Sequence, residues 1–112
     1  YLVNLQVKDM FKRPRPIDAN QLDSYSMPSG HTMASLAFLS MIAFVICLFI
    51  KKRSLQIIIW LITTGTAVLC GFSRIAANRH FVTDILAGWS LAGAWILVMF
   101  IIYESLKNKE QK

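Results

Sequence analysis

His80 and Asp84 are the residues of this chain whose types and spacing best fit nucleophilic chemistry. Four positions apart, they would lie on one face of a helix if that helix extends back to His80. A carboxylate bonded to one imidazole nitrogen fixes the tautomer and leaves the lone pair of the other nitrogen free to act as nucleophile or base. The second histidine, His31, could then protonate a departing oxygen as general acid. These three residues predict catalysis rather than binding alone.

The basic residues nearest to the histidines predict that the reacting group carries negative charge. Lys8, Arg15 and Arg74 fall in the same polar segments as the two histidines, and Arg binds phosphate through two parallel hydrogen bonds. Ser29 is a good N-cap for a helix that begins at the Pro-Ser-Gly-His run, and the amides of Gly30 and of the histidine after it would then lack intrahelical partners. Free amides at a helix start attract anions, so this set of residues predicts a phosphate site.

A metal centre is an alternative use of the same side chains, since two histidines and one aspartate could supply three ligands. The Lys and Arg side chains around them would repel a divalent cation, however. Cys47 and Cys70 fall inside apolar stretches and show no CxxC or Cys/His spacing, so we expect buried thiols rather than ligands or a disulfide. We therefore expect no metal and no other cofactor.

Three long stretches without any charged residue or histidine must position these side chains. They cover residues 33–50, 54–73 and 85–103, which are 18, 20 and 19 residues long. A helix needs about 20 residues to cross a hydrocarbon core roughly 30 Å thick. Helices of a soluble bundle would each need a polar face, which these stretches lack. The chain is 55% hydrophobic and only 16% charged, and it predicts an all-α transmembrane helical bundle with three spans, the last beginning near Asp84.

Three successive spans place the polar segments alternately on two sides of the membrane. Segments 1–32 and 74–84 then share one side and contain every candidate site residue, whereas the turn at 51–53 and the tail at 104–112 share the other. Each side holds six of the twelve basic residues, so the positive-inside rule alone does not orient the chain. Because the first six are expected to serve the site, we expect a cytoplasmic tail and an extracytoplasmic site. A net charge of +6 that is divided between two membrane faces also argues against a nucleic-acid partner.

Three short motifs in the sequence resemble the signature of the type-2 phosphatidic acid phosphatase superfamily. K-x6-R-P is matched by Lys8 and Arg15-Pro16, P-S-G-H by residues 28–31, and S-R-x5-H-x3-D by Ser73-Arg74, His80 and Asp84. Every motif position is occupied, in the family's order and spacing, and two spans lie between the second and third motifs. The resemblance covers roughly residues 5–103.

The resemblance implies a role for each matching residue. His80 would attack phosphorus to form a phosphohistidine, Asp84 would orient it, and His31 would protonate the leaving oxygen. The phosphoryl oxygens would be bound by Lys8, Arg15, Ser29, Gly30 and Arg74. Family members have six transmembrane helices, so the chain (1–112) would be a single catalytic membrane domain fragment that holds the fourth to sixth helices and works with N-terminal helices missing from it. Other cations near the site would anchor the chain at the membrane surface or contact the headgroup: Lys12, Arg13 and Arg79.

The implied function is that of a lipid phosphate phosphatase in the cell membrane. Small bacterial members act on phosphatidylglycerophosphate, undecaprenyl diphosphate or phosphatidic acid; we expect the first, with the second close behind, although the residues themselves leave the choice open. Vanadium haloperoxidases resemble the family at the same motifs, but they are soluble, and three uncharged spans argue against them. A non-catalytic membrane protein that binds phosphate or lipid headgroups is the third interpretation.

Overall fold

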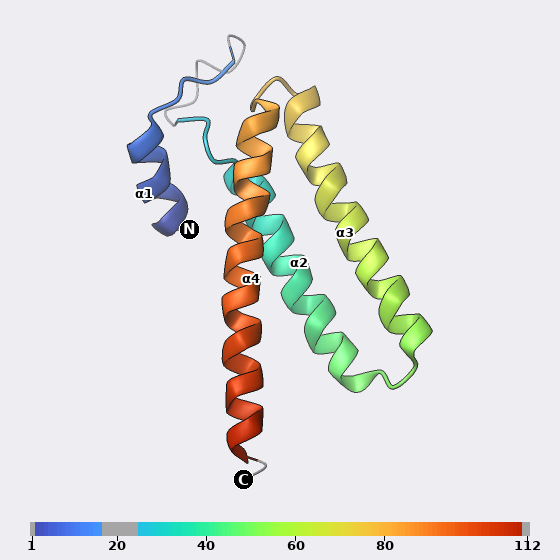
Figure 1. Cartoon of the computed structure of the whole chain (residues 1–112). Coiled ribbons are helices and arrows are strands. Elements are labelled where there is room, and N and C mark those ends of the chain that lie inside the picture. The colour runs from blue at the N-terminus through green and yellow to red at the C-terminus, as the bar shows by residue number, and fades with distance from the viewer. Residues whose placement is uncertain (1, 17–24, 111–112) are drawn as a thin grey trace.

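The structure of the protein is a computed structural model that describes residues 2–16 and 25–110. These residues form four helices in the order α1 (Leu2–Phe11), α2 (Gly30–Phe49), α3 (Arg53–Ala76) and α4 (Val82–Glu110) (Figure 1). No strand occurs within the described ranges, and the predicted all-α class is confirmed. Part of the predicted site loop (17–24) and the last residues of the predicted tail (111–112) lie outside the described residues.

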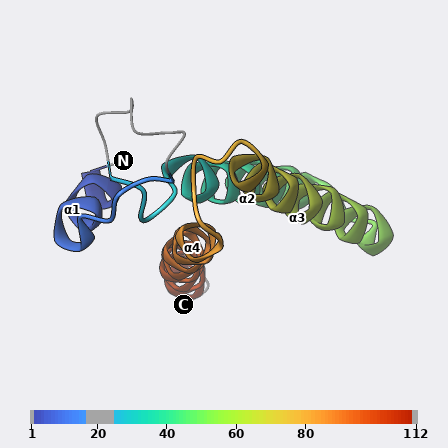
Figure 2. The ribbon, with the colours of Figure 1, turned by 90° about the horizontal axis from the view of Figure 1, so that it is seen from above.

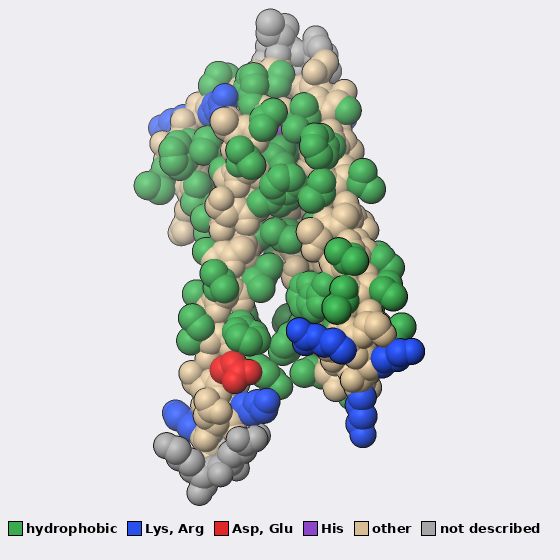
Figure 3. Space-filling view, turned by 45° about the vertical axis from the view of Figure 1, so that its right-hand side comes forward, with side chains coloured by type: hydrophobic (Ala, Val, Ile, Leu, Met, Phe, Trp, Pro, Cys, Tyr) green, Lys and Arg blue, Asp and Glu red, His purple; other side chains and the backbone are tan. Residues whose placement is uncertain are grey.

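Three of the helices are long and apolar enough to cross a membrane. They are Gly30–Phe49, Arg53–Ala76 and Val82–Lys109, with mean hydropathies of 2.4, 1.9 and 2.2. The predicted spans lie inside them, apart from Ile50, which follows the end of α2. In each helix only 17% of an 18-residue apolar stretch is buried. Apolar side chains cover much of the face in Figure 3, and Lys and Arg lie near its ends. The helices thus present an apolar exterior suited to lipid or to further membrane helices.

Helix α4 begins at Val82, slightly before the expected start, because Phe81 caps it. The Phe81 carbonyl oxygen accepts the N–H groups of Asp84 at 3.0 Å and of Ile85 at 3.4 Å. The Asp84 Oδ2 reaches back to the Phe81 N–H at 2.9 Å, which is the acidic half of a capping box. Asp84 therefore lies within the first turn of α4 rather than at its start.

Helix α2 begins where the sequence predicted, but the Ser29 hydroxyl does not cap it. Ser29 has an extended backbone (φ −70°, ψ 110°), and its side chain makes no capping hydrogen bond. The Ser29 Oγ instead accepts a hydrogen bond from Thr32 Oγ1 at 2.9 Å. Both side chains are fully buried, so the Thr32 hydroxyl occupies the oxygen that a cap would use. The predicted side-chain cap was wrong.

Helix α2 packs against both α3 and α4, whereas α3 and α4 diverge from each other away from the loop that joins them (Figure 1). Phe44 of α2 and Tyr103 of α4 meet edge to face, with ring centroids 5.1 Å apart. Near the other end, Gly88 lets α4 approach the start of α2, because a Cβ there would lie 2.9 Å from the Ser29 carbonyl oxygen. This approach sets the starts of the two helices side by side.

Candidate active site

Four segments that are distant in the sequence meet at one end of the molecule: the stretch after α1, the start of α2, the end of α3 and the start of α4 (Figures 1 and 2). Two backbone hydrogen bonds connect them. The Ser29 N–H donates to the Asp84 carbonyl oxygen at 3.0 Å, and the Ser26 N–H donates to the Arg13 carbonyl oxygen at 2.9 Å. The segments that carry the candidate site residues therefore share one end, as alternating spans require.

His80 is buried, with 5% of its surface exposed, in the loop before α4. Its Nδ1 lies 2.9 Å from the Ser26 carbonyl oxygen. A carbonyl oxygen only accepts hydrogen bonds, so Nδ1 carries the proton and the neutral ring has its lone pair on Nε2. That nitrogen lies 3.4 Å from Nη1 of Arg15. The unprotonated nitrogen of the ring thus lies beside a cation that could hold an oxyanion.

The surroundings of His80 favour its neutral form. Burial lowers the pKa of the imidazole below its ordinary value of 6.5, and the positive charges of Arg15 and, to a smaller extent, Lys8 lower it further. The Asp84 carboxylate and the hydrogen bond to Ser26 raise this pKa, but the net shift is downward. The uncharged form of the imidazole therefore predominates at neutral pH, and in this form one ring nitrogen keeps its lone pair.

Asp84 is fully buried, and its carboxylate is held by three groups. Its Oδ2 accepts the Phe81 N–H at 2.9 Å and lies 3.6 Å from Nδ1 of His80. Its Oδ1 accepts a hydrogen bond from Nη1 of Arg13 at 3.1 Å. Because α4 begins after His80, the helix does not bring the two residues together, and the preceding turn does so instead. The short hydrogen bond of the imidazole goes to the Ser26 carbonyl, so the carboxylate acts on the ring through its charge.

Lys8 and Arg15 bring two positive charges to this end of the molecule. Lys8 is only 9% exposed on α1; burial lowers its pKa, Arg15 lowers it further, and Asp84 opposes the shift. Burial also lowers the pKa of Arg15, as does Arg79, against the opposing effect of Asp84. The Arg15 Nη1 donates to the Arg79 carbonyl oxygen at 3.1 Å. Cations that destabilise one another in this way favour the binding of a phosphate between them.

Ser29 and Gly30 form the start of α2. The Ser29 N–H is occupied by the Asp84 carbonyl oxygen at 3.0 Å, so it is not available to a ligand. The N–H groups of the first turn, from Gly30 onward, have no intrahelical acceptor and favour an anion. A Cβ at Gly30 would lie 3.2 Å from Oδ1 of Asn4, whose Nδ2 donates to the Pro28 carbonyl oxygen at 3.3 Å. Glycine at this position thus permits the close approach of α1.

His31 and Arg74 lie at the same end as His80, but among the described residues no hydrogen bond or ion pair joins either side chain to it. His31 is exposed in the first turn of α2. Arg74 is half-buried in the last turn of α3, where its Nε donates to the Ser73 Oγ at 3.4 Å. The site that the structure assembles directly therefore consists of Lys8, Arg15, Ser29, His80 and Asp84, with Gly30 beside it.

Two residues that the sequence motifs did not single out hold the histidine and the aspartate. Ser26 binds His80 through its carbonyl oxygen at 2.9 Å, and Arg13 binds Asp84 through its guanidinium at 3.1 Å. A backbone acceptor leaves no side-chain signature, so nothing in the sequence identifies Ser26. Arg13 has one signal, its position two residues before Arg15 across a proline.

A metal centre would need at least three ligating side chains close together. Within residues 2–16 and 25–110, no three His, Cys, Asp or Glu side chains gather closely enough to hold an ion. The metal-free reaction stays a prediction.

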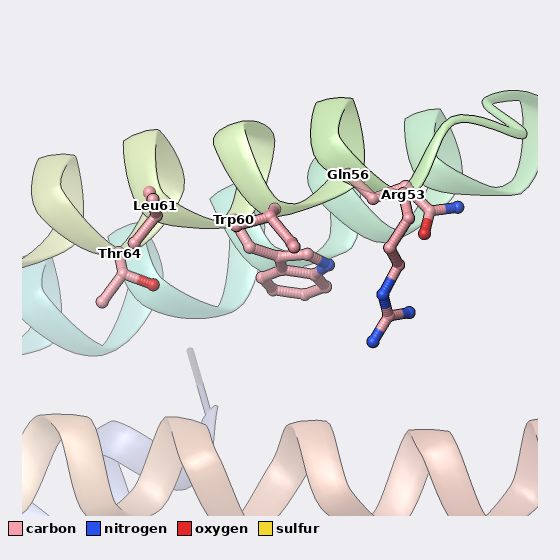
Figure 4. Close-up of a pocket in the computed structure, with 6 residues that line it drawn as sticks. Arg53, Gln56, Trp60, Leu61 and Thr64 are labelled. Atoms are coloured by element: carbon pink, nitrogen blue, oxygen red, sulfur yellow. The ribbon is translucent and has the colours of Figure 1, made fainter.

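A groove of about 340 Å³ lies elsewhere, along α3 near its first residues (Figure 4). It is lined by Arg53, Gln56, Ile57, Trp60, Leu61 and Thr64. Helix α3 begins at the end of the molecule opposite to the one at which α4 begins (Figure 1). The groove is therefore separate from the candidate active site.

The chain matches the family model of the PAP2 superfamily over residues 1–107. It is 34% identical to phosphatidylglycerophosphatase B of Bacillus subtilis (strain 168), across 99% of this chain and 56% of that protein. It is 33% identical to undecaprenyl-diphosphatase of Sulfolobus acidocaldarius, across 88% of this chain and 41% of that protein. The crystal structure of a transmembrane PAP2-type phosphatidylglycerolphosphate phosphatase from Bacillus subtilis superposes with a TM-score of 0.77 at 32% identity, covering 96% of this chain and 53% of that one.

These similarities agree with the three motifs and with the arrangement of the helices. The chain spans about half the length of the relatives that it matches. The family match extends over almost the whole chain, including both histidines and every segment that meets at the candidate active site. The chain belongs to the PAP2 superfamily, the family that its motifs resemble.

Proposed function

We propose that the protein hydrolyses a phosphomonoester of a lipid headgroup through a phosphohistidine on His80. The observation that carries this proposal is the orientation of the imidazole, with Nδ1 2.9 Å from the Ser26 carbonyl oxygen and Nε2 3.4 Å from Arg15. A neutral ring that carries its proton on Nδ1 cannot donate a hydrogen bond through Nε2 to a bound phosphate. It can attack phosphorus with that nitrogen instead.

The first step transfers the phosphoryl group to the protein. The lone pair of His80 Nε2 attacks phosphorus while the bond between phosphorus and the lipid oxygen breaks. His31 gives its proton to that oxygen, and the lipid leaves as an alcohol. Lys8, Arg15, Arg74 and the first-turn amides of α2 neutralise the negative charge on the remaining oxygens. The buried Asp84 carboxylate, 3.6 Å from Nδ1, stabilises the positive charge that develops on the ring.

The second step restores the histidine. His31, now neutral, takes a proton from a water molecule whose oxygen attacks phosphorus. The bond between phosphorus and Nε2 breaks, inorganic phosphate leaves, and the lone pair returns to His80. No electron acceptor or further reactant is needed, because water supplies the oxygen and the proton of the second step.

The preferred substrate is phosphatidylglycerophosphate, which would yield phosphatidylglycerol. Support comes from the relatives named for that activity, at 34% and 32% identity. Undecaprenyl diphosphate is the alternative, supported by a relative at 33% identity, and phosphatidic acid is the third candidate. All three carry a terminal phosphate beside a long apolar chain. The reaction thus fits a site at the membrane surface, with the chain as one catalytic domain of a longer protein.

The site is proposed to face the outside of the cell membrane, with Lys51, Lys52, Arg53 and the tail in the cytoplasm. Arg79→Cys and Lys52→Cys, each introduced after the native cysteines, Cys47 and Cys70 among them, are replaced by serine, test this orientation with a membrane-impermeant maleimide on intact cells. The first should be labelled and the second protected. Labelling of Lys52→Cys alone would reverse the orientation.

The function is tested by phosphate release from purified phosphatidylglycerophosphate, undecaprenyl diphosphate and phosphatidic acid, using the full-length protein in detergent. We expect the highest kcat/KM for the first lipid. A denaturing quench in alkali during turnover should retain radiolabelled phosphate on the protein, since phosphohistidine survives alkali and is lost in acid. If no lipid releases phosphate while headgroup binding persists, the protein is a binder, and halide oxidation only after vanadate addition would indicate a haloperoxidase.

A further inference from the structure

Arg13 contacts both residues that face Nδ1 of His80, which are Asp84 and Ser26. Its Nη1 donates to Asp84 Oδ1 at 3.1 Å and also to the hydroxyl of Thr83. Its guanidinium lies over the Phe81 ring, 4.3 Å from the ring centroid. Its own carbonyl oxygen accepts the Ser26 N–H at 2.9 Å. One residue from the segment after α1 thus connects to the first turn of α4 and to the stretch that precedes α2.

The two prolines explain why Arg13 reaches this place. A residue that precedes proline is restricted to extended backbone, so Pro14 and Pro16 keep Arg13 and Arg15 extended. In extended chain, residues two apart point to the same side. Arg15 accordingly places its guanidinium at Nε2 of His80, and Arg13 places its own at the carboxylate that faces Nδ1.

The buried carboxylate needs such a partner. Asp84 is fully buried, and a buried charge is stable only when it is paired and hydrogen-bonded. Arg13 occupies Oδ1, and the Phe81 N–H occupies Oδ2. These two contacts fix the plane of the carboxylate, and that plane sets Oδ2 3.6 Å from Nδ1 of His80.

The second support of the ring is also tied to Arg13. The Ser26 carbonyl oxygen accepts the Nδ1 proton of His80, and the N–H of the same Ser26 donates to the Arg13 carbonyl oxygen. Main chain and side chain of one residue therefore hold both acceptors that face Nδ1. We propose that Arg13 is a positioning residue, which acts on His80 through Asp84 and Ser26 and keeps Nε2 aimed at phosphorus. The inference rests on the proposed phosphatase function.

The test compares Arg13→Met with Arg53→Met in the full-length protein. Met keeps the apolar stem over Phe81 and removes the charge and the donors. Arg53 is exposed and begins α3 at the opposite end of the molecule (Figure 1), so Arg53→Met makes the same replacement away from Asp84. Arg13→Lys is a second variant, which keeps the charge and loses the planar fork.

The kinetic expectation separates positioning from binding and from folding. Arg13→Met should lower kcat roughly 10- to 100-fold, the size typical of groups that orient a functional side chain through another residue, with KM changed by less than about threefold. Arg13→Lys should lie between wild type and Arg13→Met, and Arg53→Met should match wild type. An equal loss in Arg53→Met, or a rise in KM without a fall in kcat, would overturn the proposal.

A measurement without turnover keeps the two proposals distinguishable. NMR titration of labelled histidine, with His80 assigned through His80→Gln, reports the ring directly. The charged groups that face the ring are Arg15, Asp84 and Lys8. The Asp84 carboxylate stabilises the imidazolium more strongly when the positive charge of Arg13 no longer offsets the carboxylate charge. Arg13→Met should therefore move the His80 titration to higher pH, and Arg53→Met should not.

The outcomes then divide cleanly. A shifted titration in Arg13→Met together with no phosphate release by the unsubstituted protein would remove the proposed function and retain the positioning of His80. Normal phosphate release with an unshifted titration and unchanged kcat in Arg13→Met would retain the function and overturn the role of Arg13.

Discussion

The Ser29 N–H donates to the Asp84 carbonyl oxygen at 3.0 Å, which fixes the start of α2 against the first turn of α4. Two apolar helices separate these residues along the chain, and Gly88 of α4 makes room for the contact. The expected phosphate-binding turn at Ser29 and Gly30 therefore lies beside the first turn of α4, which carries Asp84.

Substituting Gly88 should disturb this contact. A Cβ at Gly88 would lie 2.9 Å from the Ser29 carbonyl oxygen, whereas a Cβ at Gly93 of the same helix would meet nothing within 4 Å. We expect Gly88→Ala to destabilise the protein by about 1–3 kcal/mol, as overpacking does, and to lower activity. Gly93→Ala should be neutral or slightly stabilising because alanine favours helix. Thermal unfolding in detergent checks both, and equal melting temperatures would contradict the proposed close contact.

Removing the nucleophile should abolish turnover without unfolding the protein. His80→Ala is expected to lower kcat by at least about 10⁴-fold, since catalytic groups that act as a unit show losses of this order. It should also eliminate the alkali-stable phosphoprotein. His31→Ala should lower kcat but leave the phosphohistidine able to accumulate, because the attack of water on the phosphohistidine is slowed as well. Turnover by His80→Ala above a hundredth of the wild-type rate would exclude a phosphohistidine at this position.

The pH dependence follows from the surroundings of His80. Burial and Arg15 lower its pKa below 6.5, and only the neutral ring attacks. The kcat/KM should therefore stay constant down to mildly acidic pH and decrease once the pH is low enough to protonate His80. Arg15→Met removes one cause of the lowering, so the acid limb should move to higher pH. Arg53→Met is the control, because ionisation of the substrate affects all variants alike. An acid limb that stays in place in Arg15→Met would contradict the assignment.

Replacing Arg15 and replacing Arg74 should have different effects on the steady-state kinetics. Arg15 lies 3.4 Å from Nε2 of His80, so Arg15→Met should reduce kcat/KM by roughly 10²- to 10³-fold, as the loss of a transition-state donor does. Arg74 contacts Ser73, and Arg74→Ala should impair both phosphate binding and the chemical step if its side chain turns to the substrate. Steady-state kinetics on one lipid decide this, and a normal rate in Arg74→Ala would remove it from the phosphate-binding set.

Metal removal and vanadate address the chemistry itself. The full-length enzyme should keep its rate in EDTA, because nucleophile, acid and cations all come from side chains. Vanadate should inhibit competitively, since its trigonal-bipyramidal form is close to the transition state of phosphoryl transfer. A large loss in EDTA that Mg²⁺ restores would defeat the metal-free mechanism.

The membrane helices could be predicted from the sequence because an uncharged stretch of about 20 residues has few other uses. Their ends were less predictable. Helix α3 continues through Arg74 to Ala76, since a cation is favourable in the last turn of a helix. Helix α4 begins at Val82 because its cap is the Phe81 backbone together with the Asp84 carboxylate, a combination that the acidic residue alone does not reveal.

The meeting of His80, Asp84 and Arg15 at one end of the molecule could be predicted from side-chain type and spacing, and their chemical roles stay predictions. The partner of the His80 Nδ1 could not be predicted, because it is the carbonyl oxygen of Ser26 and depends on how two loops meet. The contact between Arg13 and Asp84 could not be predicted either. It joins residues on either side of two membrane helices, and only their packing brings the two together.

The capping role of Asp84 gives one side chain two separate duties. Its Oδ2 binds the Phe81 N–H at 2.9 Å and initiates α4, while its charge acts on His80 from 3.6 Å. A truncated residue at this position would confound a loss of rate with an unravelled helix start. Asparagine retains an oxygen acceptor for the amide and discards the charge, so Asp84→Asn is the replacement that assigns electrostatics and architecture independently.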